Sequence, residues 1–211
     1  MGRSVVPCVA VTGCVASGKS LFGRLLAERG AEVLDADEVI HRLQCPGGAL
    51  SRAIADSFGK VFLHPDGSVN RPELAKVVFG DPEALSRLNR LAHPLAREVF
   101  RAWRGRDGSG RDGSPSRPQA WAKVGLIPLL FESGWEEDWD FTVCLRSPQE
   151  SRLCRSAERG WTEAMFSERE AAQWPEERKA AASAMVIDND GDLGKLAIAA
   201  DDLKKRILDG K

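Results

Sequence analysis

Short apolar runs alternate with longer amphipathic stretches along most of the chain. The runs are rich in β-branched residues and end at Gly, Pro or Asp, a pattern typical of buried parallel strands. They predict strands at Val5–Val11, Ala31–Asp35, Trp121–Ile127, Phe141–Leu145 and Met185–Ile187. Apolar residues at helical spacing predict helices at Leu21–Arg29, Gln149–Glu170 and Leu193–Leu208. Strands that alternate with helices predict an α/β fold in three layers, with a parallel sheet covered on both faces.

Residues 36–105 depart from this alternation, because their pattern is mostly helical. Asp81 and Pro82 predict a capped helix start with proline in the first turn, and the apolar stripe from Leu85 to Val99 predicts core packing. The following segment, 104–118 (RGRDGSGRDGSPSRP), nearly lacks apolar residues and predicts a flexible surface loop. An alternative role for its arginines is to grip phosphate.

Composition and charge narrow the classes of function. The 211 residues have a formal net charge of -1, which argues against nucleic acid as the main partner. The five cysteines are odd in number and none has C-x-x-C spacing, so we expect reduced thiols rather than a zinc site or disulfides. No stretch reaches the ~20 apolar residues of a membrane span, and the first residues lack the apolar part of a signal peptide. We therefore expect a cytoplasmic protein with no membrane partner.

The segment Gly13–Ser20 (GCVASGKS) matches the P-loop pattern G-x-x-x-x-G-K-[ST] at every fixed position. It lies between a predicted strand and a predicted helix, where backbone N–H groups and the helix dipole favour phosphate. We expect Lys19 to reach the β- and γ-phosphates of a nucleotide and the hydroxyl of Ser20 to bind Mg²⁺. The residues expected to bind the nucleotide are Gly13, Cys14, Ala16, Ser17, Gly18, Lys19, Ser20 and Leu21.

Asp35 and Asp37 follow at the carboxyl end of the second predicted strand. The strand–helix–strand pattern places that strand beside the P-loop strand, at the edge where open α/β sheets bind ligands. A carboxylate there is able to orient and deprotonate an acceptor hydroxyl, or to help hold Mg²⁺. The alternative is that one of the two carboxylates caps the following helix.

The ordered set of motifs resembles the dephospho-CoA kinase family over nearly the whole chain. The matching segments are VTGCVASGKS, VLDADEVIHRL, NRPELAKVVFGDPEALSRLNRLAHP, IPLLFESGWEEDWD and MVIDNDG. The resemblance implies that the chain phosphorylates the ribose 3′-hydroxyl of dephospho-CoA, the last step of coenzyme A synthesis, with ATP and Mg²⁺ as cofactors. It also implies one P-loop NTPase-type domain over residues 1–211. The parts of that domain would be a core (about 4–43 and 119–211), a helical region for the CoA substrate (about 44–103), the loop 104–118 and a lid (about 150–173).

The resemblance also assigns roles to single residues. It makes Asp37 the base for the ribose hydroxyl, with Lys19 as the second catalytic residue. The residues that it places on the substrate side are Asp35, Asp37, Arg71, Phe79, His93 and Glu132, the last at a strand end. The residues themselves leave a structural alternative open for three of these positions. Arg71 would then be a solvated charge at a helix start, Phe79 a core residue, and His93 a capping or packing residue.

Three further residues are implied on the nucleotide side. Asn189 would lie near the adenine pocket, while Arg155 and Arg159 of the lid would neutralise the charge on the transferred phosphoryl group. The sequence does not separate the two arginines.

The chain departs from the family pattern in the P-loop, in the lid, in the 104–118 segment, which resembles an insertion, and at Ala184, which replaces an acid. Leu21 stands where the family usually has threonine, and the lid lacks the acid that follows its arginine. Two alternatives to the implied function stay open. One is a kinase for another small acceptor, such as a nucleoside monophosphate or shikimate, and the other is a nucleotide-binding module that has lost turnover. The oligomeric state is unknown from the sequence.

Overall fold

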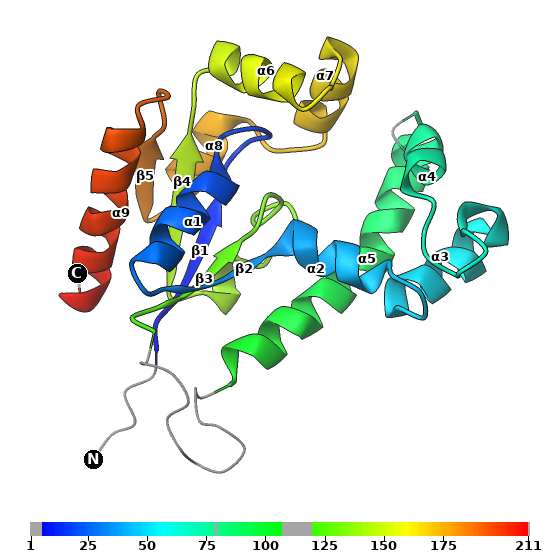
Figure 1. The fold of residues 1–211 in the computed structure, drawn as a ribbon, viewed down its shortest axis with the longest axis horizontal. Coiled ribbons are helices and arrows are strands. Elements are labelled where there is room, and N and C mark those ends of the chain that lie inside the picture. Colours follow the sequence, from blue (N-terminus) through cyan, green and yellow to red (C-terminus); the bar gives the residue numbers. More distant parts are fainter. Residues whose placement is uncertain (1–5, 79, 107–119, 211) are drawn as a thin grey trace. The chain divides into compact units, whose positions relative to one another are not determined.

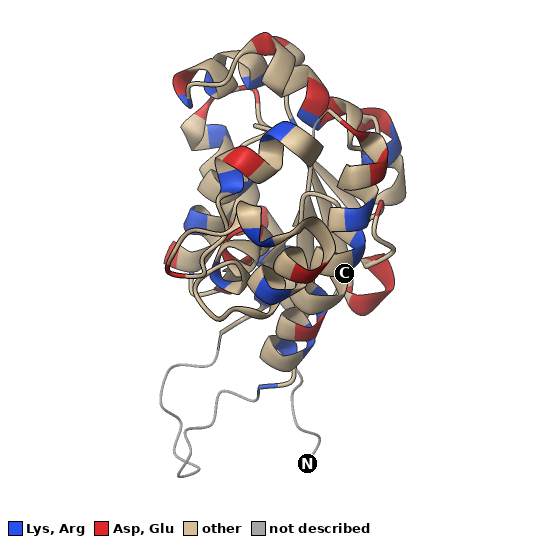
Figure 2. Cartoon of the chain, turned by 90° about the vertical axis from the view of Figure 1, so that its right-hand side faces the viewer, with Lys and Arg blue, Asp and Glu red and all other residues tan. Residues whose placement is uncertain are grey.

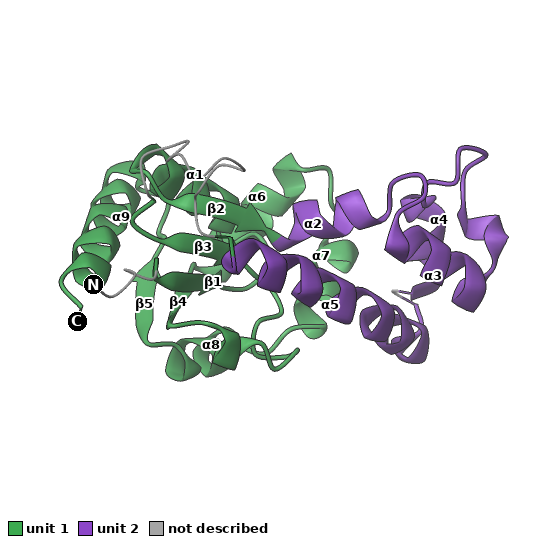
Figure 3. Ribbon diagram, turned by 90° about the horizontal axis from the view of Figure 1, so that it is seen from below, with its two compact units in different colours: residues 1–35, 106–211 green, residues 36–105 purple. Residues whose placement is uncertain are grey.

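The computed structural model describes residues 6–78, 80–106 and 120–210. The chain divides into two compact units, which Figure 3 colours separately. Unit 1 contains Met1–Asp35 and Arg106–Lys211, and unit 2 contains Ala36–Gly105. Unit 2 therefore begins at the first residue after the second strand.

Unit 1 is built on a sheet in which all neighbouring strands are parallel (Figure 1). The described strands are β1 (Cys8–Thr12), β2 (Glu32–Asp35), β3 (Lys123–Leu126), β4 (Phe141–Arg146) and β5 (Met185–Asp188). Each overlaps a strand that the apolar pattern predicted. The α/β class and the parallel sheet are therefore confirmed.

The strand order corrects one expectation. The order is β2-β3-β1-β4-β5, so β3 separates β2 from the P-loop strand β1, and the prediction that the two are neighbours was wrong. Burial explains the placement, because all four residues of β3 are buried whereas β2 exposes Glu32. A strand with an exposed charge suits the edge of a sheet. The parallel strands still end at one edge of the sheet, so Asp35 and the P-loop lie at the same edge.

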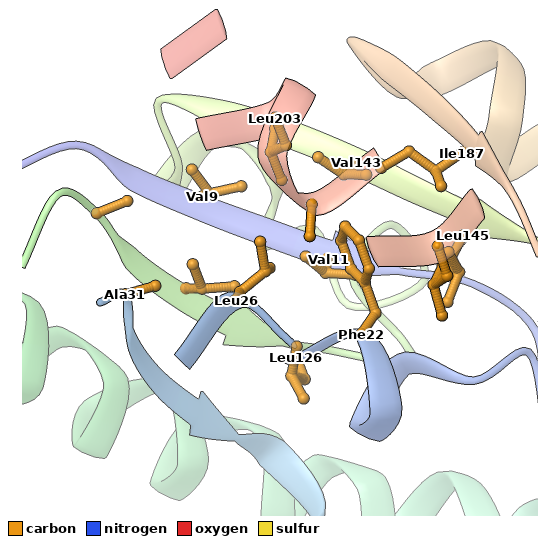
Figure 4. Packing of buried hydrophobic residues seen from close by; sticks show 14 residues of the cluster. Val9, Val11, Phe22, Leu26, Ala31, Leu126, Val143, Leu145, Ile187 and Leu203 are labelled. Atoms are coloured by element: carbon orange, nitrogen blue, oxygen red, sulfur yellow. The ribbon is translucent and has the colours of Figure 1, made fainter. Parts of the chain in front are cut away.

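Helices cover both faces of this sheet (Figures 1 and 3). Helices α1 (Lys19–Glu28) and α9 (Leu193–Leu208) pack together on one face, and α8 (Glu176–Ala182) lies on the other. Phe22 and Leu26 of α1 join Leu203 of α9 in one core with the inward side chains of the strands (Figure 4). Burial of these apolar side chains is the main force that holds the layers together.

The predicted helix Gln149–Glu170, which makes up most of the segment 150–173 (called the lid segment below), is not a single helix. It forms α6 (Gln149–Glu158) and α7 (Glu163–Ala171), and the break between them lies at Gly160, whose φ is 77°. Thr162 then caps α7, because its side chain accepts the hydrogen bond of Met165 N. Helix α8, which follows Pro175, was not predicted either.

Unit 2 is helical, as the pattern of residues 36–105 predicted. Its elements are α2 (Ala36–Leu43), α3 (Ala49–Phe58), the 3₁₀ turn η1 (Lys60–Phe62), α4 (Arg71–Val78) and α5 (Pro82–Arg104). The apolar stripe of α5 packs against a core that includes Leu50 and Ile54, which confirms the packing interpretation. The predicted cap is also confirmed, because the Asp81 side chain accepts from Glu83 N at 2.8 Å.

The predicted loop 104–118 is described only at its start. Helix α5 extends to Arg104, so this residue is helical rather than part of a loop. Residues 107–118 lie outside the described residues, and the loop stays a prediction there.

Candidate nucleotide-binding site

The P-loop joins the carboxyl end of β1 to the start of α1. Its backbone takes positive φ at Gly13 (148°), Ala16 (56°) and Gly18 (98°). A Cβ atom would clash at both glycines, since it would lie 2.4 Å from Leu145 O at Gly13 and 2.3 Å from Asn189 Nδ2 at Gly18. The glycines therefore permit both the turn and the close approach of neighbouring chain.

Lys19 is the first residue of α1, and its amine folds back over the P-loop. Its Nζ donates to Gly13 O and to Cys14 O, each at 2.9 Å, and lies 3.4 Å from Ser17 Oγ. The first N–H groups of a helix have no intrahelical partner, and they sit at the positive end of the helix dipole. The cation and these donors together make one spot that is well suited to phosphate.

Ser20 and Asp35 approach each other at the same edge of the sheet. Ser20 Oγ donates to Asp35 Oδ2 at 3.5 Å, a long hydrogen bond. The Ser20 side chain is exposed, and Asp35 is half-buried at the end of β2. The structure therefore brings Asp35 to the P-loop although β2 is not the neighbour of β1.

Polar side chains from later parts of unit 1 hold the P-loop backbone from outside. They come from α6, from the loop after β5 and from the segment between α7 and α8. The contacts are Arg155 Nη1 to Ala16 O at 3.0 Å, Asn189 Nδ2 to Ser17 O at 2.8 Å, and Val15 N to Gln173 Oε1 at 2.9 Å. The surrounding chain thus helps to set the shape of the loop.

The two lid arginines lie in different surroundings. Arg155 is half-buried and binds the P-loop carbonyl together with Ser147 Oγ, to which it donates at 2.9 Å. Arg159 is exposed at the end of α6, with its guanidinium 6.0 Å from the centre of the Trp161 ring. Of the two, Arg155 is the one that the structure places at the P-loop.

The expectation that Glu132 lies at a strand end is wrong. It belongs to a turn that begins at Pro128, after β3 has ended at Leu126. Its Oε1 lies 2.9 Å from Nζ of Lys179, and it accepts the hydrogen bond of Trp174 N at 2.6 Å. The described contacts of Glu132 are thus with Lys179 and Trp174 of this chain.

Unit 2 carries the other predicted substrate residues. Asp37 is exposed in the first turn of α2, Arg71 is exposed at the start of α4, and His93 is half-buried within α5. Asp37 is the second residue of α2 and so lies past the N-cap position that the capping alternative requires. Phe79 lies outside the described residues. The roles expected of these residues stay predictions.

Burial disfavours the thiolate form of two cysteines near the P-loop. Burial raises the pKa of the Cys14 thiol, and it raises the pKa of the Cys144 thiol to about 12. Lys179 lies near enough to oppose the shift at Cys14, but burial is the larger cause. Burial therefore disfavours a negative charge on the Cys14 thiol within the P-loop.

Known proteins resemble this chain over most of its length. The dephospho-CoA kinase family model matches residues 7–195. The dephospho-CoA kinase of Symbiobacterium thermophilum is 36% identical over 188 residues, which are 89% of this chain and 75% of that protein. The chain belongs to the dephospho-CoA kinase family.

Solved structures share the fold of this chain. A crystal structure of a Thermus thermophilus protein has a TM-score of 0.70 and 31% identity, and the match covers 95% of this chain and 97% of that one. The dephospho-CoA kinase of Campylobacter jejuni has the same fold, with a TM-score of 0.65 at 23% identity over 96% of this chain and 98% of that one. As a member of the dephospho-CoA kinase family, the chain is a phosphotransferase that takes a nucleotide and a small-molecule substrate. The predicted family and enzyme class are confirmed.

Sequence reasoning missed two residues of this dephospho-CoA kinase family member, one that binds the P-loop and one that lies near it. Gln173 binds the loop directly, and Lys179 is a fully buried cation that pairs with Glu132. No local sequence pattern identifies the contact between Gln173 and Val15, because the two residues lie 158 positions apart. Only the packed fold shows these contacts.

The described part of the chain has no helix that is both long and apolar enough to cross a bilayer. Within the same residues, no three or more His, Cys, Asp or Glu side chains are grouped so as to hold a metal ion. Basic and acidic residues are interspersed on the helices rather than sorted by sign (Figure 2).

Proposed function

We propose that the chain transfers the γ-phosphoryl group of ATP to the ribose 3′-hydroxyl of dephospho-CoA, which gives coenzyme A and ADP in the cytoplasm. The family to which the chain belongs supports this reaction. The observation that carries it is the Lys19 amine, held at the start of α1 within hydrogen-bond distance of two P-loop carbonyls. That geometry concentrates positive charge where the terminal phosphates of a nucleotide would bind.

The P-loop binds the phosphates of ATP in this proposal. Lys19 exchanges its two neutral carbonyl partners for phosphate oxygens, because a charged acceptor makes a stronger hydrogen bond with an ammonium group. The residues that surround the phosphates are Gly13, Cys14, Ala16, Ser17, Gly18, Lys19, Ser20 and Leu21. Asn189 lies toward the base of the nucleotide, and Arg155 and Arg159 reduce the negative charge that the transfer develops.

Ser20 and Asp35 fit a magnesium ion that accompanies ATP. A hydroxyl and a carboxylate are hard oxygen donors, and their side chains approach each other at 3.5 Å beside the P-loop. Mg²⁺ usually takes only one or two protein ligands and completes its shell with phosphate oxygens and water, so a larger acidic cluster is not required. When bound, the ion neutralises charge on the β- and γ-phosphates.

Asp37 accepts the proton of the ribose 3′-hydroxyl in this proposal. Its side chain is exposed in the first turn of α2, where a substrate is able to reach it. General-base assistance of this kind contributes about 10²- to 10⁴-fold to a rate. Asp35, Arg71, Phe79, His93 and Glu132 are the further residues proposed for the side of dephospho-CoA.

The proposal is tested by ADP release from Mg-ATP with dephospho-CoA as the acceptor. We expect release that depends on dephospho-CoA and that falls about 100-fold or more in Asp37→Asn, which removes the base. We expect a similar loss in Lys19→Ala, which removes a charge from the phosphates. Product analysis by mass spectrometry identifies coenzyme A as the second product.

Matched variants show whether the losses are specific. Glu38→Gln changes the next carboxylate of the same helix turn, and Lys76→Ala removes an exposed lysine of α4 that pairs with Glu73. Both should leave the rate near that of the wild type. Binding of ATP without turnover on dephospho-CoA would overturn the proposal, and a screen of nucleoside monophosphates and shikimate would then test another acceptor.

A further inference from the structure

Gln173 joins the end of the lid segment to the P-loop. Its side-chain carbonyl accepts the hydrogen bond of Val15 N at 2.9 Å, across 158 positions of sequence. Val15 precedes Ala16, which has a φ of 56°. A residue other than glycine holds that conformation only where its surroundings fix it. The amide of Val15 is therefore held beside the residue that has this unfavourable backbone conformation.

The backbone that presents Gln173 is anchored through its neighbour Trp174. The Trp174 ring stacks on Phe131 with ring centres 5.8 Å apart and planes at 13°, and the Arg178 guanidinium lies 3.3 Å from its centre. The Trp174 amide donates to Glu132 at 2.6 Å, and Glu132 pairs with the buried Lys179. Gln173 therefore extends from a fixed base rather than from a free loop.

The P-loop backbone is thus held at three successive residues by side chains that supply the complementary hydrogen-bonding group. Val15 offers a donor and meets the carbonyl of Gln173, whereas Ala16 and Ser17 offer acceptors and meet the donors Arg155 and Asn189. A loop that is already in its binding shape loses less conformational freedom when a ligand binds. This arrangement makes each outer partner a means of tuning nucleotide affinity.

We propose that Gln173 is a positioning residue for the nucleotide: it fixes the Val15 amide and so keeps the P-loop in its phosphate-binding shape. The inference deepens the proposed function, because it assumes that the phosphates of a nucleotide occupy this loop. Gln173 acts through the loop backbone and not by contact with the reacting atoms. It also ties the last residue of the lid segment to the loop, so that the end of this segment cannot leave while the contact holds.

The first test compares nucleotide affinity in Gln173→Met and the wild type. Methionine keeps the length of the side chain and removes the acceptor. Because a neutral hydrogen bond has a modest net value, we expect the Kd of ATP and of ADP, measured by calorimetry, to rise about fivefold. The Kd of dephospho-CoA should stay unchanged. The control is Gln149→Met, which makes the same replacement at the start of α6, where the amide contacts Glu170 at 3.4 Å.

The second test observes the contact directly through hydrogen exchange of the Val15 amide by NMR. The amide should exchange faster in Gln173→Met than in the wild type. In Gln173→Glu a carboxylate oxygen replaces the carbonyl as acceptor, so protection of Val15 should return. A residue with a merely structural role would lower the melting temperature without this selective loss and rescue.

Unchanged ATP affinity in Gln173→Met, or unchanged exchange at Val15, would overturn the inference. If Gln173→Met does not fold, Gln173→Asn retains an amide but is one methylene too short, and the same two measurements decide. Neither test depends on phosphoryl transfer to an acceptor. Failure to phosphorylate dephospho-CoA would therefore refute the proposed function while the affinity and exchange results still judge the role of Gln173.

Discussion

Lys179 and Glu132 form an ion pair of 2.9 Å, in which the lysine side chain is fully buried and the glutamate side chain is 13% exposed. Lys179 also donates to Pro128 O, so the cation is held by the turn that follows β3. Taking both charges out of water is costly, and the pair with its added hydrogen bonds offsets that cost. The pair fastens α8 to the turn that supports Trp174.

Removal of the lysine alone should be strongly destabilising. In Lys179→Met, Glu132 keeps its charge in a largely buried place without its cation, and we expect a loss of about 3 to 5 kcal/mol in the free energy of unfolding. Urea denaturation measures it. The double variant Glu132→Gln/Lys179→Met removes both charges and should recover a large part of the loss.

A second ion pair provides the control for this prediction. Lys195 pairs with Asp190 at 2.7 Å, but both side chains are well exposed, at 65% and 47%. Exposed pairs contribute little, so Lys195→Met should leave the unfolding curve nearly unchanged. Equal effects of Lys179→Met and Lys195→Met would contradict the buried-pair interpretation.

Gly18→Ala should impair both folding and nucleotide binding. The φ of 98° is unfavourable for alanine, and the new Cβ would lie 2.3 Å from Nδ2 of Asn189, which itself binds Ser17 O. We expect a loss of about 2 to 3 kcal/mol in stability, because backbone strain and a clash are added together. Calorimetry should show that ATP no longer binds measurably.

Two further variants separate the steric clash from the backbone strain in this loss of stability. Gly134→Ala introduces the same side chain at a φ of 63° with nothing within 4 Å, so it should cost only about 1 kcal/mol. The double variant Gly18→Ala/Asn189→Ala relieves the clash and should recover part of the stability. If the double variant is no more stable than Gly18→Ala, the contact with Asn189 is not the cause.

The sequence predicted those features that are encoded locally. Apolar runs located all five described strands, and the helix at Leu193–Leu208 was predicted with its observed bounds. The break at Gly160 was missed, because the apolar spacing continues on both sides of one positive-φ residue. The order of β2 and β3 was also wrong, since it depends on which strand ends up buried on both sides, and this is a property of the assembled sheet.

The candidate site likewise combines features that are encoded locally with features that depend on packing. The P-loop was recognised because Gly13, Gly18 and Lys19 lie within seven residues and obey one spacing. Arg155 was named from the resemblance, but its partner, a P-loop carbonyl 139 positions away, follows only from packing. Gln173 was not named at all, because an isolated glutamine after a helix carries no signal without its partner.

Asp81 provides a test of the stability of unit 2. Its side chain accepts the hydrogen bond of Glu83 N at 2.8 Å at the start of α5, a helix of 23 residues. Asp81→Ala leaves this N–H without a side-chain partner, and we expect a loss of about 1 kcal/mol in unfolding by urea. Asp81→Asn keeps an acceptor and should remain close to the wild type. A loss in Asp81→Asn as large as in Asp81→Ala would show that charge, not capping, is responsible.

The buried thiol of Cys144 makes stability depend on pH in the alkaline range. Burial raises its pKa to about 12 in the folded protein, whereas an unfolded cysteine has a pKa of about 8.5. Above about 8.5 the unfolded chain loses the thiol proton and the folded chain keeps it, so stability falls as the pH rises through this window. Between about pH 8 and about pH 10, titration of this thiol should lower the free energy of unfolding by about 2 kcal/mol.

Comparison with Cys144→Ala isolates that contribution. The variant loses some packing at every pH, because Cys144 is fully buried on β4, but it has no thiol to titrate. Its deficit relative to the wild type, measured by urea denaturation, should therefore shrink by about 2 kcal/mol between the two pH values. Val143→Ala provides the control, since Val143 is also fully buried on β4 but carries no titratable group, so its deficit should show no such change. A constant deficit for Cys144→Ala would mean that the folded thiol ionises as readily as the unfolded one, so that burial does not protect its proton.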